Sequence, residues 1–124
     1  MKIEYLKNGS PDCPLVRIYG ENKEEWIQLK SSFSQLTQGH TSEVSIHHLK
    51  GFVSIDRCEV TAELGQRDIG ITETDNNKFR CILTNDTWDN IEYLLTPFCN
   101  GKKGFQWLDE TSNISLLIST SGMW

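Results

Sequence analysis

Between Cys58 and Leu83, apolar and polar residues alternate through three consecutive runs. In the first run every second residue is apolar, from Cys58 to Leu64, and the residues between them are polar. A period of two predicts a strand with one buried face. The third run repeats the pattern, with apolar residues at Phe79, Cys81 and Leu83. These runs therefore predict neighbouring strands that share one apolar face.

Two short polar segments separate the runs. Gly65-Gln66 fits a two-residue hairpin loop, in which glycine supplies the positive φ of a type II′ turn, and this loop would place Ala62 opposite Ile69. Asp75-Asn76-Asn77 fits a three-residue loop, because asparagine tolerates the left-handed position that such a loop requires. We therefore predict a three-stranded antiparallel meander at about residues 58–84.

Two further segments carry apolar residues at helical spacing. The first covers about residues 22–38, where Asn22 is a suitable N-cap and Gly39 a suitable end. The second covers about residues 86–96, begins near Asn85-Asp86 and stops or kinks before Pro97. Both apolar stripes predict amphipathic helices that cover one face of the sheet.

Strand-like composition also recurs outside the meander. The segments are Lys2 to Leu6, Leu15 to Tyr19, Glu43 to Leu49, Phe52 to Ile55 and Ile114 to Ser119. The order of strands and helices predicts an α+β fold, with an antiparallel sheet covered by two helices in a single globular domain, residues 1–124. The final run, Ile114 to Ser119, would be an exposed edge strand through which a homodimer forms.

Composition narrows the choice of partner and compartment. The chain of 124 residues has a net charge of −5, and Lys102-Lys103 is its only notable basic cluster, so we expect no nucleic-acid partner. No apolar run approaches the roughly 18 residues of a membrane span, and the first residues do not resemble a signal peptide. These features predict a bacterial-type cytoplasmic location and no membrane association. Buried free thiols are expected in that compartment, with an oxidised Cys58–Cys81 pair as the alternative.

Few residues suggest chemistry. His47 and His48 are adjacent, and in a strand they would point to opposite faces, so no shared metal site is expected. No cofactor motif is present, because Gly101-Lys102-Lys103-Gly104 lacks the spacing of a phosphate-binding loop. Cys13 lies in a proline-braced loop that would hold a nucleophile rigidly, yet its acidic neighbour Asp12 disfavours the thiolate. The alternative is a structural turn in which the thiol packs.

Acidic residues are concentrated in the meander. Six of them stand between Asp56 and Asp75 against two arginines, and the predicted register places Glu59, Glu63 and Asp68 on one face. Such a face attracts a positively charged partner. The leading hypothesis is therefore a non-enzymatic protein-interaction module that presents this acidic face to a basic protein. An immunity-like protein, which neutralises a basic toxin, is one concrete version.

Large aromatic residues occur late in the chain. Trp107 and Trp124 either close the core or line an exposed groove beside Gln106 and Asp109, where an aromatic anchor would support binding. The second function hypothesis is a small enzyme or ligand-binding domain, with a pocket near Cys13, His47 or His48 and Trp107.

Overall fold

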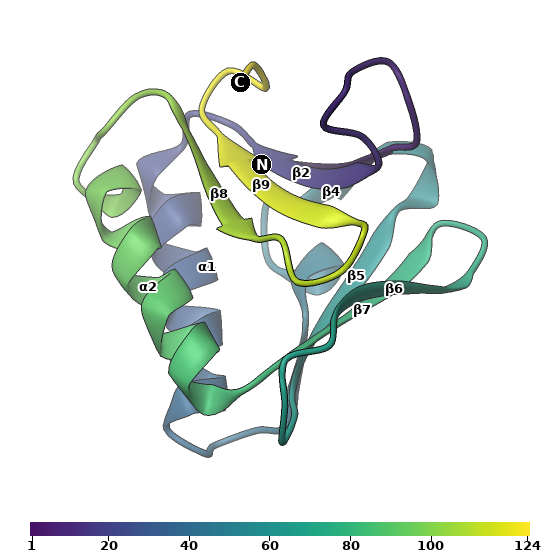
Figure 1. Cartoon of the computed structure of the whole chain (residues 1–124). Coiled ribbons are helices and arrows are strands. Elements are labelled where there is room, and N and C mark those ends of the chain that lie inside the picture. Colours follow the sequence, from purple (N-terminus) through teal and green to yellow (C-terminus); the bar gives the residue numbers. More distant parts are fainter.

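The computed structural model describes residues 1–124 and arranges two β-sheets and two helices around a shared core (Figure 1). The five-stranded sheet contains β1 (Lys2–Leu6), β2 (Leu15–Tyr19), β4 (Val53–Ser54), β8 (Phe105–Asp109) and β9 (Ser115–Ser119). The four-stranded sheet contains β3 (Glu43–Ser45), β5 (Glu59–Leu64), β6 (Gly70–Asp75) and β7 (Lys78–Leu83). The helices are α1 (Lys23–Thr37) and α2 (Asn85–Cys99), with short 3₁₀ turns η1 (Ile46–His48) and η2 (Ile55–Arg57). The α+β class and the two helices are confirmed.

Both sheets are mixed, so the prediction of an antiparallel sheet is wrong. In the five-stranded sheet the order is β4-β1-β2-β9-β8, and β2 runs parallel to β9. Strand β9 therefore lies in the interior of this sheet, and the final apolar run is not an edge strand. The sequence suggested an edge because it carries no charge, but full burial of Leu116, Leu117 and Ile118 explains that composition equally well.

The four-stranded sheet corrects the predicted meander. Its order is β3-β5-β7-β6, with β5 parallel to β7, so β5 and β6 are not neighbours. Ala62 pairs with Cys81 instead of Ile69. The apolar residues of β5 still face the core in this arrangement, since Val60 and Ala62 are fully buried. An alternating pattern fixes which side of a strand faces the core, and it does not fix which strand lies beside it.

Local hydrogen bonds explain why no hairpin forms at Gly65. The N–H of Gly65 donates to the carbonyl of Leu83 at 2.9 Å, and the N–H of Ile69 donates to the carbonyl of Ile82 at 2.9 Å. The segment between them thus passes the end of β7 and continues on its far side. Positive φ occurs instead at Gly70, at +84°, where an added Cβ would lie 2.8 Å from the backbone nitrogen of Ser112.

The second predicted turn does form a hairpin. Strands β6 and β7 pair antiparallel, and Asn77 adopts the left-handed conformation with φ of 56°. The connection is shorter than expected, because Asp75 pairs with Lys78 and leaves a two-residue loop. A register shift between Glu73 and Asp75 accommodates the remaining residue as a bulge.

The helices pack against each other and close one side of the core (Figure 1). Asn22 caps α1 as predicted, accepting the N–H of Glu25 at 3.2 Å. Helix α2 starts one residue after its N-cap Thr84 and continues through Pro97 to Cys99, so both predicted boundaries were too narrow. Pro97 has no N–H to donate to the carbonyl four residues earlier, and the helix ends two residues after it, at Cys99. Trp26 and Trp88 are the tryptophans that fill the core.

The remaining expectations concern cysteines and membrane spans. Cys58 and Cys81 are buried free thiols. Cys81 on β7 lies beside Ala62 on β5, and Ala62 is four residues after Cys58 in the sequence. Four residues of strand span about 13 Å, well beyond the reach of a disulfide. Burial raises the pKa of the Cys58 thiol to about 12. Neither helix is long and apolar enough to cross a bilayer.

Candidate functional site

The predicted acidic residues Glu59 and Glu63 lie on the outer face of β5, and each has a cationic partner. Glu63 accepts two hydrogen bonds from the Arg80 guanidinium, at 2.6 and 2.8 Å, and this lowers the pKa of the Glu63 carboxyl. Glu59 lies 3.4 Å from Nε2 of His47 and 3.7 Å from Nζ of Lys78. The charges on this face are thus largely matched between neighbouring strands.

Asp68 does not belong to the acidic face, contrary to the predicted register. It lies in the segment that crosses from β5 to β6, and its carboxylate accepts the N–H of Thr84 at 2.8 Å and the hydroxyl of Thr87 at 2.8 Å. These bonds lower the pKa of the Asp68 carboxyl. A carboxylate at the first turn of a helix satisfies free N–H groups and interacts favourably with the helix dipole. Asp68 therefore caps α2.

His47 and His48 lie on η1 and not on opposite faces of a strand, and their rings contact each other with centroids 4.3 Å apart and planes tilted by 59°. Nδ1 of His47 lies 3.1 Å from the backbone nitrogen and 3.2 Å from the carbonyl oxygen of Val60, and Nε2 faces Glu59. Both ring nitrogens of His47 are engaged within the chain. No group of three or more His, Cys, Asp or Glu side chains is placed to hold a metal ion.

A polar hollow of about 580 Å³ opens beside this histidine pair. Its lining comes from η1, β4, η2, β5 and the β6–β7 turn and contains no hydrophobic residue. All three non-glycine residues with positive φ line it, namely Asp56, Arg57 and Asn77. The side-chain amide of Asn77 donates to the Asp56 carbonyl at 2.8 Å and joins the two strained segments. Such backbone conformations concentrate at functional sites.

The outer face of the five-stranded sheet has a different character. Strand pairing places Glu4, Arg17, Leu117 and Trp107 in one row across it, and Lys2, Tyr19, Ser119 and Phe105 in the next. The tail, residues 120–124, folds back over this face. Phe105 is 44% exposed and Met123 is 72% exposed, while Trp107 and Trp124 are half-buried. We call Phe105, Trp107, Met123 and Trp124 the aromatic patch.

Trp107 and Trp124 are half-buried and neither belongs to the core, so the first of the two predicted alternatives is wrong. Their surroundings also differ from the prediction. Gln106 points to the opposite side of β8 from Trp107, because successive residues of a strand alternate, and Asp109 is buried. The polar neighbours of the patch are residues of β1 and β2 and of the loop between them.

Arg17 connects the sheet to the tail. Its Nε and Nη2 donate to Oε1 of Glu4 at 3.0 and 2.5 Å, and its Nη1 donates to the Gly122 carbonyl at 2.6 Å. The guanidinium also lies 4.4 Å from the centre of the Tyr19 ring. The Tyr19 hydroxyl donates to the same Glu4 oxygen at 3.4 Å. One half-buried side chain thus holds β1, β2 and the tail together.

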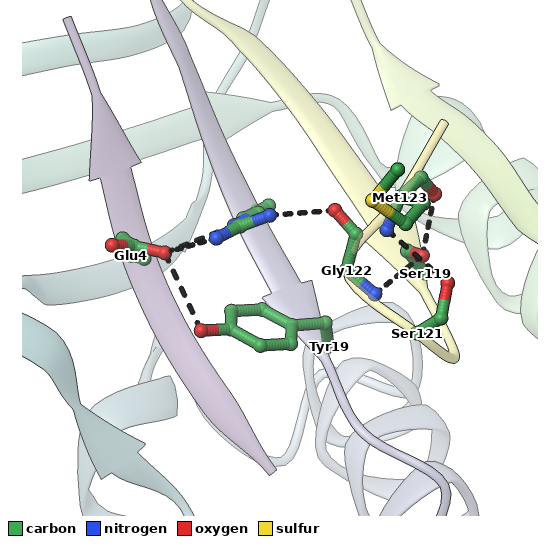
Figure 2. A network of polar contacts seen from close by, with 7 residues as sticks. Glu4, Tyr19, Ser119, Ser121, Gly122 and Met123 are labelled. Atoms are coloured by element: carbon green, nitrogen blue, oxygen red, sulfur yellow. Dashed lines mark hydrogen bonds and ion pairs between the residues drawn. The ribbon is translucent and has the colours of Figure 1, made fainter.

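Two further contacts fix the tail. Ser119 accepts the N–H of Gly122 at 2.9 Å and donates its hydroxyl to the Met123 carbonyl at 2.7 Å (Figure 2). Gly122 has φ of +87°, and an added Cβ would lie 3.2 Å from both Arg17 Nη1 and the Tyr19 ring. Glycine is therefore required on conformational and steric grounds. These contacts present Met123 and Trp124 in a defined position.

A second hollow, of about 320 Å³, lies between the tail and the loop that joins β1 to β2. Its lining residues are Ser10, Asp12, Arg17, Gly122, Met123 and Trp124. The Trp124 indole N–H donates to Oδ2 of Asp12 at 2.9 Å. This bond orients both the indole ring and the carboxylate at the opening of the hollow.

The pocket predicted near Cys13, His47 or His48 and Trp107 is not assembled. His47 and His48 line the hollow on the four-stranded sheet, whereas Trp107 lies on the outer face of the other sheet and Cys13 lines neither hollow. Arg17, Phe105 and Met123 were not anticipated from the sequence. A single arginine within the apolar run Leu15 to Tyr19 was the available signal. No protein-family model, curated protein or solved structure matches this chain.

Proposed function

We propose that this protein is a non-enzymatic interaction module that recognises a partner protein with the outer face of its five-stranded sheet. The observation that carries the proposal is the aromatic patch on this face, in which Phe105 is 44% exposed, Met123 is 72% exposed, and Trp107 and Trp124 are half-buried. Exposed apolar groups gathered on one face are typical of binding surfaces.

The composition of this face supports the proposal. Aromatic residues, methionine and arginine are enriched in protein–protein interfaces, and tryptophan, tyrosine and arginine dominate the binding energy of many complexes. The face carries all of these types, in Arg17, Tyr19 and the aromatic patch. The Arg17 and Ser119 contacts already hold the tail in place before a partner binds. This preorganisation lowers the entropy cost of association.

We infer a partner with a positively charged surface, since the chain has a net charge of −5. Glu59 and Glu63 contribute to this overall charge. Their carboxylates are already paired with His47, Lys78 and Arg80, so they are expected to steer the partner at a distance more than to contact it directly.

The test compares two double variants of the full chain as baits in native extracts. Phe105→Ala with Met123→Ala removes exposed apolar surface from the patch, and Ile27→Ala with Tyr93→Ala removes comparable surface from the two helices. We expect a basic protein that wild type and the helix variant retain equally and the patch variant retains at least about tenfold less, as for loss of an interface anchor. Equal retention by all three baits would contradict the proposal.

A second candidate function rests on the strained hollow beside His47 and His48. Asp56, Arg57 and Asn77 hold left-handed conformations around a fully polar space, which would suit a small, strongly hydrated ligand. Replacing Arg57 with glycine relieves the backbone strain at φ of 60° and removes the side chain from the hollow. If the hollow binds a metabolite, a screen of polar metabolites by thermal shift should stabilise the wild type and leave Arg57→Gly unchanged.

A further inference from the structure

The hollow between Asp12 and Trp124 combines a carboxylate with an indole ring. Trp124 donates to Oδ2 of Asp12, and Oδ1 of the same carboxylate has no hydrogen-bond partner within the chain. Asp12 is exposed, and no Lys, Arg or His side chain lies within ion-pair distance of it. The carboxylate therefore retains a free, oriented acceptor atom at the mouth of the hollow.

Arg17 also lines this hollow, but its charge is already compensated. Its guanidinium forms an ion pair with Glu4 at 2.5 Å, and the third nitrogen donates to Gly122. The side chains of Arg17 and Glu4 are about equally exposed, at 20% and 21%, so neither charge of the pair faces solvent alone. The uncompensated charge of the hollow is that of Asp12, and it is negative.

A negative charge beside an aromatic ring is the arrangement that binds organic cations. An ammonium or guanidinium group gains from a carboxylate by ion pairing and from the face of tryptophan by the cation–π interaction, for which tryptophan is the best of the aromatic residues. Met123 adds an exposed apolar wall, which suits the methylene chain of a lysine or arginine side chain.

We propose that this hollow is the subsite that receives a lysine or arginine side chain of the partner protein. The inference rests on the proposed function, which it extends by naming the partner's contacting group. Asp12 binds the cationic head group, Trp124 covers it, and the aromatic patch contacts the surface around it. The protein thus recognises the positive charge of its partner at the hollow between Asp12 and Trp124.

The test uses three small probes and the Trp124 indole resonance in ¹H–¹⁵N spectra of the full chain. The probes are the acetyl methylamides of arginine, of lysine and of citrulline, the last having the shape of arginine without its charge. We expect saturable shifts of the Trp124 resonance with the two cationic probes and not with citrulline. Equal shifts with arginine and citrulline in the wild-type protein would overturn the inference without any variant.

Asp12→Asn provides the matched variant, because asparagine keeps an oxygen that accepts the Trp124 N–H. We expect it to weaken binding of the arginine probe about threefold or more, as for loss of a partly exposed ion pair, whereas Asp89→Asn on the exposed side of α2 leaves it unchanged. Equal binding by wild type and Asp12→Asn would overturn the inference.

The two proposals fail in different ways. If a partner requires Phe105 and Met123 but the probes do not shift Trp124, the interaction module stands and the cation subsite is wrong. If the cationic probes bind at Asp12 but no protein depends on the aromatic patch, the subsite stands and the proposed function is wrong.

Discussion

The outer faces of the two sheets differ in how many of their charged side chains are paired with each other. On the four-stranded sheet, carboxylates and cations alternate between neighbouring strands, as in the Glu63–Arg80 and Glu59–Lys78 pairs. On the five-stranded sheet, a single ion pair between Glu4 and Arg17 anchors the tail. The aromatic patch and the free carboxylate oxygen of Asp12 remain available there.

This difference shows that the number of charges on a face is a poor guide to its binding capacity. A carboxylate that is already paired must lose its partner before it contacts another protein, and exposed ion pairs contribute little in either case. An exposed apolar side chain has no ion-pair partner within the chain that must be displaced before it contacts another protein. The face with fewer charges is therefore the better candidate for an interface.

The largest effect is expected from Arg17→Met, which keeps an unbranched apolar stem and removes the guanidinium donors. Glu4 is left half-buried without a cation, and the tail loses its bond to Gly122. We expect the free energy of unfolding, measured by urea denaturation, to fall by about 2 kcal/mol. Arg80→Met on the other sheet is the control and should cost less, because Arg80 is exposed. Equal losses would show that the two ion pairs serve the same role.

A smaller effect is expected from Asp68→Asn, which tests whether this residue belongs to the acidic face or to the cap of α2. Loss of the cap should lower the free energy of unfolding by about 1 kcal/mol at neutral pH. Because the pKa of Asp68 is lowered in the folded state, its contribution is present above the ordinary pKa of an aspartate and is lost as the pH falls through the lowered value. The two proteins should therefore converge in urea titrations at acidic pH. A constant difference at every pH would contradict this role.

The smallest effect is expected from neutralising the paired carboxylates, with Glu59→Gln and Glu63→Gln together. Capture of the partner should weaken by no more than about threefold at moderate salt, because these side chains act by long-range steering. The same measurement on Phe105→Ala with Met123→Ala provides the comparison. If the double glutamine variant loses more of its partner capture than the double alanine variant, the interface lies on the four-stranded sheet instead.

Local chemistry made part of the fold predictable. Asn22 capped α1, the apolar stripes identified both helices, and Asn77 took the left-handed position of the β6–β7 turn. Strand neighbours were not predictable in the same way. Gly65 allowed a hairpin, but the carbonyls of Ile82 and Leu83 and the cap formed by Asp68 stabilised a crossing segment instead. These hydrogen-bonding partners are distant in sequence, so no local sequence pattern predicts them.

The candidate site was predictable only through its aromatic residues. Trp107 and Trp124 were recognised because large aromatic residues occur late in the chain, whereas Phe105 and Met123 required knowledge of which face of the sheet lacks a cover. Arg17 was hidden for a related reason: its role depends on Glu4 and on Gly122, which is 105 positions later. The contact between the His47 and His48 rings was missed because a 3₁₀ turn replaced the expected strand.

The central position of β9 has a consequence for synthesis of the chain. Each residue of β2 pairs with a residue 100 positions later, from Leu15 with Ser115 to Tyr19 with Ser119. During translation, β1 and β2 can form their hairpin early, but the open side of β2 stays unpaired until the chain has been synthesised through β9. An unpaired apolar strand is prone to pair with other chains. The nascent chain is therefore exposed to aggregation at β2 until β9 has left the ribosome.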